Sequence, residues 1–75
     1  MNHDNLIKMA NQIGTFFESM PDREAATRDV ANHIRATWEP RMIDALRQRI
    51  DGQGGGEVLE IVRRALQVHL PPKAQ

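Results

Sequence analysis

Apolar side chains recur every three or four positions through most of the chain, which is the spacing of one face of an α-helix. Two prolines interrupt the pattern, Pro21 and Pro40, and a residue that precedes proline is disfavoured in helical geometry. Asp22 can cap the helix that follows the first of these breaks, because its carboxylate can accept hydrogen bonds from free backbone N–H groups. The predicted helices cover about 5–20, 23–38, 40–50 and 57–69.

A glycine-rich stretch at 52–56 separates the third predicted helix from the fourth. Gly52 is expected to end the third helix in a left-handed conformation, and the following glycines form a flexible linker. This flexibility favours a last helix that docks loosely on the others or moves onto a partner. The residues at 71–75 are expected to form a loose tail after the last helix. The sequence therefore predicts an all-α fold, a small single-domain bundle of about four short helices over residues 1–75.

The chain has 75 residues and no cysteine, so neither a disulfide nor a thiolate metal site can reinforce its core. A domain of this size buries only roughly 60–65% of the surface that its unfolded chain exposes. We therefore expect a thin core and some stability contributed by a partner. A substrate-sized pocket is also unexpected in so short a chain, which favours a binding or assembly module over an enzyme.

Charge argues against two classes of partner. Ten Lys and Arg residues balance ten Asp and Glu residues, and the isoelectric point is about 6.8. Without a net positive charge, the chain has no long-range attraction for nucleic acid or an anionic membrane. No apolar run approaches the roughly 18 residues of a membrane span. The polar N-terminus lacks the features of a secretory signal, so we expect a cytoplasmic protein.

No residues form a recognisable catalytic or metal-binding pattern. His3, His33 and His69 are far apart, and none has an acidic residue or a second histidine at a metal-binding spacing. Ser19 is not part of a glycine-flanked nucleophile turn. The three glycines at 54–56 lack the lysine and hydroxyl residue of a phosphate-binding loop. We therefore assign no catalytic, cofactor-binding or metal-binding residue.

A cluster of arginines keeps nucleic-acid binding open as an alternative function. The four arginines in and around the second and third predicted helices are Arg35, Arg41, Arg47 and Arg49. Two short helices joined by a turn resemble a helix-turn-helix, in which such arginines would contact phosphates. Carboxylates at Glu39, Asp44 and Asp51 reduce the local positive charge and oppose phosphate binding. A small DNA-binding or transcription-associated protein is therefore one alternative, and a self-assembling homo-oligomer is another.

The three aromatic residues are Phe16, Phe17 and Trp38. Phe16 and Phe17 lie about 100° apart around a helix, so a narrow core cannot bury both rings. Either a broad apolar stripe buries both, or one ring joins an exposed patch for a partner. Aromatic residues, methionine and arginine are enriched at the centres of protein interfaces. The predicted partner-binding residues are Asn11, Gln12, Phe17, Trp38, Arg41 and Met42.

Two sequence blocks resemble a known protein family. The first is KMANQI at 8–13, followed by FF at 16–17 and then Pro21; the second is ANHIR at 31–35, continuing to WEPRM at 38–42. In order and at this spacing they resemble the delta subunit of NAD-dependent formate dehydrogenase. The chain departs from the pattern next to its tryptophan, with threonine where an aromatic residue is usual and glutamate where aspartate is more common.

The resemblance implies a non-catalytic accessory subunit of a cytoplasmic formate dehydrogenase that contains molybdenum or tungsten. Its expected partner is the large catalytic subunit, which in this family carries bis-molybdopterin guanine dinucleotide and iron–sulfur clusters. Other subunits carry FMN and further clusters and pass electrons to NAD. The delta chain itself carries no cofactor, and its expected role is to support complex stability or cofactor insertion.

Overall fold

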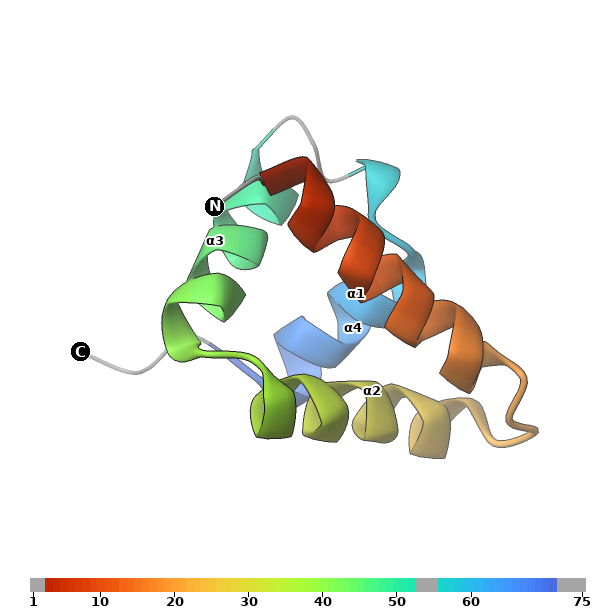
Figure 1. Cartoon of the computed structure of the whole chain (residues 1–75). Coiled ribbons are helices and arrows are strands. Elements are labelled where there is room, and N and C mark those ends of the chain that lie inside the picture. The colour runs from red at the N-terminus through yellow and green to blue at the C-terminus, as the bar shows by residue number, and fades with distance from the viewer. Residues whose placement is uncertain (1–2, 53–55, 72–75) are drawn as a thin grey trace.

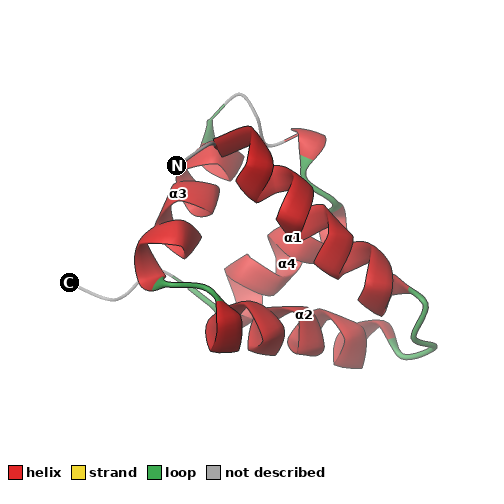
Figure 2. Ribbon diagram, in the orientation of Figure 1, coloured by secondary structure: helices red, strands yellow, loops and turns green. Residues whose placement is uncertain are grey.

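The structure, a computed structural model, describes residues 3–52 and 56–71 of the chain (Figures 1 and 2). These residues form four α-helices and no strand, which confirms the predicted all-α fold. The helices are α1 (His3–Glu18), α2 (Arg23–Thr37), α3 (Pro40–Asp51) and α4 (Glu60–His69). The bounds of the first three lie within two residues of the predicted ranges.

The first three helices form the sides of a triangle, and α4 lies behind it in the view of Figure 1. Helix α1 packs against each of the other three helices, and α4 also packs against α2. Four residues of α4, Ile61, Val62, Ala65 and Leu66, are almost completely buried. The expectation of a loosely docked last helix is therefore wrong, because α4 supplies a large part of the apolar core.

The breaks between helices follow the chemistry of their residues. Asp22 caps α2, since its Oδ1 accepts hydrogen bonds from the backbone N–H groups of Glu24 and Ala25 at 3.0 and 3.2 Å. Pro40 is the first residue of α3, where its missing N–H removes no helical hydrogen bond. Glu39 precedes it in an extended conformation and makes no side-chain cap hydrogen bond.

The end of α3 differs from the prediction. Gly52 has φ −93° and ψ −150°, an extended conformation, so the predicted left-handed stop is absent. Its N–H donates to the carbonyl of Gln48 at 3.0 Å, which completes the last helical turn before the chain leaves in an extended direction. The remainder of the predicted linker, at 53–55, and the end of the predicted tail, at 72–75, lie outside the described residues.

Helix α4 starts three residues later than its apolar pattern predicts. The chain makes one short helical turn at 56–57 and leaves it at Val58, whose side chain is buried in the core. Leu59 then takes an extended ψ of 145° before α4 starts at Glu60. Burial of Val58 against other helices therefore decides the local backbone here, and helical periodicity does not.

Asn11 on α1 holds this segment in place. Its Nδ2 donates to the carbonyl oxygen of Glu57 and its Oδ1 accepts from the backbone N–H of Leu59, both at 2.9 Å. Both polar ends of one side-chain amide are therefore used to bind the backbone just before α4. These hydrogen bonds to the segment before α4 therefore come from a residue of α1, and not from residues close to α4 in the sequence.

The contact between α1 and α4 depends on Gly14, which is buried. A Cβ atom at this position would lie 2.9 Å from Cγ2 of Val62, 3.1 Å from Cγ2 of Ile61 and 3.2 Å from Cδ1 of Leu59. The first two contacts are with β-branched side chains, which have few alternative rotamers. The absence of a side chain at Gly14 therefore lets the two helices approach this closely.

We expect Gly14→Ala to lower the free energy of unfolding by about 1–2 kcal/mol, because the cost of overpacking exceeds the gain in helix propensity of about 1 kcal/mol. The check is urea unfolding followed by circular dichroism. Gly56→Ala is the matched control, since a Cβ atom there would meet nothing within 4 Å. A Gly14→Ala chain as stable as the wild type would contradict close packing of α1 on α4.

Candidate interaction site

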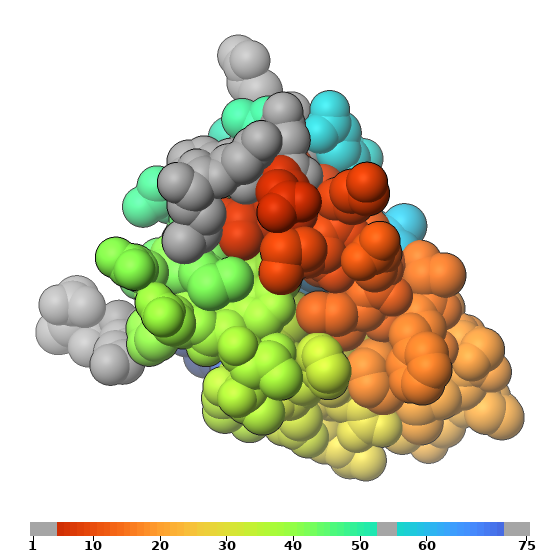
Figure 3. All heavy atoms as spheres, in the orientation of Figure 1, coloured from red at the N-terminus to blue at the C-terminus, as the bar shows by residue number. Residues whose placement is uncertain are grey.

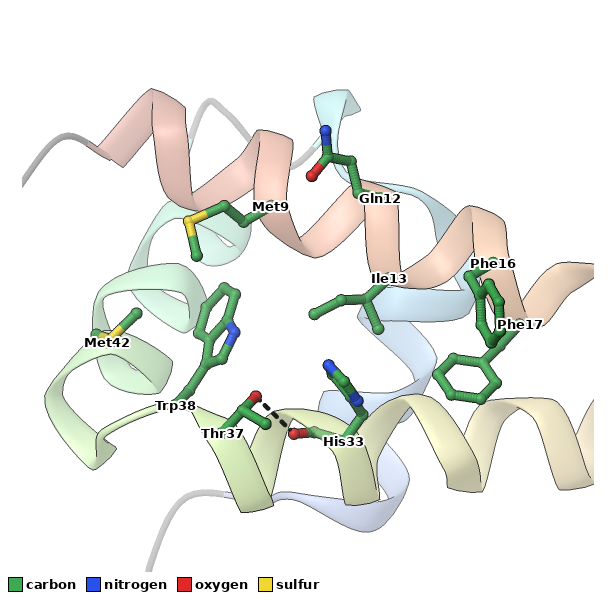
Figure 4. A pocket seen from close by; sticks show the side chains of 9 residues that line it. All are labelled: Met9, Gln12, Ile13, Phe16, Phe17, His33, Thr37, Trp38 and Met42. Carbon is green, nitrogen blue, oxygen red and sulfur yellow. Dashed lines mark hydrogen bonds between the residues drawn. The ribbon is translucent and has the colours of Figure 1, made fainter.

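An open cleft of about 560 Å³ lies where α1, α2 and the start of α3 meet (Figure 4). On the face seen in Figure 3, the red-to-orange atoms of α1 adjoin the green atoms of α2 and α3. Six of the nine lining side chains are apolar, and the other three are polar without a fixed charge. The lining residues are Met9, Gln12, Ile13, Phe16, Phe17, His33, Thr37, Trp38 and Met42.

Helix α1 lines the cleft because its apolar stripe is wider than the core needs. One side of the stripe, with Leu6 and Ala10, is buried. The adjacent side carries Met9, Ile13 and Phe16, spaced by four and three residues, and lines the cleft. In Figure 4, Met9 and Ile13 point from α1 into the space between the helices.

The two adjacent phenylalanines have different environments. Phe17 is half-buried, whereas Phe16 is 72% exposed and the most exposed large apolar residue in the described part of the chain. Their rings meet edge to face with centroids 5.0 Å apart, and the Phe17 ring also lies 6.2 Å from that of His33. One ring therefore belongs to an exposed patch, in agreement with the second of the two interpretations, and that ring is Phe16.

The end of α2 supplies the opposite wall. Thr37 donates its hydroxyl proton to the carbonyl oxygen of His33 at 2.8 Å, so this proton is already used within the chain (Figure 4). Trp38 follows in an extended conformation, and its indole points towards α1 near Met9. Only 7% of Trp38 is exposed, so this residue is part of the core as well as of the cleft.

The cleft brings together four of the six residues predicted to bind a partner: Gln12, Phe17, Trp38 and Met42. The other two lie elsewhere. Asn11 binds the backbone that precedes α4, and the Nε of Arg41 lies 3.2 Å from a carboxylate oxygen of Glu39. Both side chains of that ion pair are well exposed, at 80% and 66%.

The other lining residues were not among those predicted from the sequence to bind a partner: Met9, Ile13, Phe16, His33 and Thr37. Met9, Ile13 and Phe16 all belong to the stripe that predicts α1, so their spacing indicates a helix but does not separate core from surface. His33 and Thr37 are four residues apart on α2, on the same side of that helix. In the sequence, the signal for the α2 wall of the cleft was this pair of polar residues at helical spacing, next to Trp38.

Two arginines considered for nucleic-acid binding hold the C-terminal end of α4 instead. Arg35 donates to the carbonyl oxygen of His69 at 2.8 Å. Arg47 donates to the carbonyl oxygen of Leu70 and forms an ion pair with Asp44 at 2.8 Å. These carbonyl groups lie at the negative end of the helix dipole, where a cation is favoured. The arrangement gives these arginines a structural role.

We expect Arg47→Ala to lower the free energy of unfolding by about 1.5 kcal/mol, because it removes charged hydrogen bonds from a half-buried site. Arg41→Ala on the same helix is the matched control and should change stability by less than about 0.5 kcal/mol, since its ion pair is exposed. Urea unfolding measures both variants. Equal effects would show that Arg47 does not stabilise the end of α4.

Across the described residues, no group of three or more His, Asp or Glu side chains is placed to hold a metal ion. None of the helices in residues 3–52 and 56–71 has the length and apolar character to span a membrane.

The fold and the cleft define the class: a small all-α protein that presents an open apolar cleft on its surface. A family model described as the NADH-dependent formate dehydrogenase delta subunit FdsD matches residues 5–66. The chain belongs to this family, as its two sequence blocks indicated. The family is that of a subunit of a formate dehydrogenase complex, which implies partner subunits. No curated protein and no solved structure matched the chain.

Proposed function

We propose that the chain is a non-catalytic accessory subunit that binds the large catalytic subunit of a cytoplasmic, NAD-dependent formate dehydrogenase. Binding supports the stability of the complex or the insertion of its cofactor. The bis-molybdopterin guanine dinucleotide, the iron–sulfur clusters and FMN are carried by partner subunits, and the chain described here carries no cofactor.

The observation that carries this proposal, beside family membership, is the uncovered apolar cleft with the exposed ring of Phe16 at its edge. A small domain gains little by leaving a phenylalanine in water, and contiguous apolar surface is typical of an interaction site. Half-buried methionines beside aromatic residues are also common in protein interfaces.

The test is to produce the formate dehydrogenase subunits with and without this chain, and to purify the complex through a tag on the catalytic subunit. We expect the chain to be retained in near-equal amount. We also expect the complex made without it to contain less molybdenum or tungsten, or to lose activity faster on warming.

The two readouts separate the two roles. A lower metal content at the moment of purification indicates a role in cofactor insertion, whereas normal content with faster loss of activity indicates a role in stability. Failure to recover the chain with the other subunits, together with an unchanged complex in its absence, would contradict the proposed function.

A further inference from the structure

We propose that the cleft receives an uncharged, apolar segment of the catalytic subunit, and that Phe16 inserts into the partner beside it. This inference rests on the proposed function and adds to it the site on this chain and the chemistry of the partner segment. The reasons are the charge, the size and the edge of the cleft.

The charge of the cleft selects the partner segment. None of the nine lining residues is Lys, Arg, Asp or Glu. A charged side chain placed there would lose its hydration without gaining a counter-charge, which is strongly unfavourable. At the α2–α3 turn, the exposed side chains of Glu39 and Arg41 form an ion pair with each other. An apolar segment is therefore the chemistry that this surface accepts.

The size of the cleft limits what enters it. Its volume of about 560 Å³ is within the roughly 300–1,000 Å³ of pockets that bury one small ligand. A whole α-helix, about 10–12 Å across, does not fit in such a space. A few bulky apolar side chains do fit, projecting from a segment that lies across α1 and the end of α2.

At the edge of the cleft, Phe16 supplies a second contact, in which this chain inserts a side chain into the partner. Phe16 projects next to the opening, and its ring is braced by the edge-to-face contact with Phe17. A ring held in one orientation loses little conformational entropy when it is buried by a partner. Aromatic residues, phenylalanine included, are enriched at the centres of protein interfaces.

The experiment titrates the full chain onto formate dehydrogenase purified without it and compares two matched pairs of variants. Phe16→Ser removes the ring, and Val68→Ser makes a similar change at the other exposed large apolar residue of the described part of the chain, on α4. Thr37→Lys places a charge in the cleft, and Ala36→Lys places the same charge on the neighbouring exposed residue of α2, which does not line it. Circular dichroism confirms that every variant is folded.

We expect Phe16→Ser and Thr37→Lys each to raise the dissociation constant at least about tenfold, and each control to change it by less than about threefold. Binding of the wild type should change by less than about threefold between about 0.05 and 0.5 M salt, because charge contributes little. A larger loss of affinity with salt would contradict an apolar segment.

The remaining outcomes distinguish the inference from the function on which it rests. If the wild-type chain binds and both cleft variants bind equally well, the inference is wrong and the proposed function stands. If the wild-type chain does not bind at all, both are wrong. Sedimentation of the isolated chain tests one more alternative. If the chain forms a dimer that Phe16→Ser dissociates, and binding to the enzyme is unchanged, then the cleft binds a second copy of this chain.

Discussion

Ile61→Ala is expected to lower the free energy of unfolding by about 2–5 kcal/mol, the usual cost of truncating a fully buried isoleucine. Ile61 is completely buried in α4, and its Cγ2 would lie 3.1 Å from a Cβ atom added at Gly14 of α1. A chain of this length has about 4–11 kcal/mol of total stability, so the expected loss is a large fraction of the total. Urea unfolding followed both by circular dichroism and by the fluorescence of Trp38 measures the loss.

Val68→Ala is the control for this prediction, because it removes methyl groups from the same helix at a position that is 51% exposed. We expect its stability to lie within about 0.5 kcal/mol of the wild type. The two probes should report one transition, as expected for a single cooperative unit. A small effect of Ile61→Ala, or a separate early loss of helicity, would mean that α4 is not an integral part of the core.

Asn11→Ala is expected to cost about 2 kcal/mol, because it removes two hydrogen bonds and leaves the partly buried N–H of Leu59 without its acceptor. Asn32→Ala is the matched control. Its side chain accepts a hydrogen bond from Arg35 on the exposed surface of α2, so the loss there should be below about 0.5 kcal/mol.

Hydrogen exchange gives the Asn11 prediction a local readout. The amide of Leu59 should exchange faster in Asn11→Ala than in the wild type, by more than the amides of α2 do. Uniform acceleration of all slow amides would show instead that the variant is less stable globally and that Asn11 does not act on this segment in particular.

Most of the helical structure could be predicted because short-range chemistry determines it. Asp22 has its two cap donors within three residues, and Pro40 fixes both the end of one helix and the start of the next. The apolar stripes of α1 and α4 likewise need no knowledge of distant residues. These features depend on neighbours in the sequence, so the sequence alone is sufficient to predict them.

The predictions that are wrong concern places where distant residues decide the backbone. Val58 fits the helical pattern of α4 but lies in the connection before that helix, because its side chain is buried and Asn11, 48 residues before Leu59, binds the adjacent backbone. Short-range rules contain no information about this contact.

The residue types of the candidate site could be predicted from the sequence, but the placement of individual side chains could not. The composition of the chain indicated an aromatic and methionine-rich surface around Trp38 and Met42, and both residues line the cleft. Which of two adjacent phenylalanines faces water depends on how α1 is rotated against α2, a property of the packed structure. For the same reason, the amide of Asn11 could be predicted as a polar contact but not as an internal one.

The position of α4 after the other three helices has a consequence for synthesis in the cell. The ribosome makes α4 later than α1, α2 and α3, yet this helix supplies four almost fully buried residues and the partner surface for Gly14. Until it emerges, the apolar faces of the first three helices stay open, and such nascent chains are prone to aggregation. The newborn polypeptide is therefore expected to fold only after α4 has left the ribosome, and to be a substrate for chaperones until then.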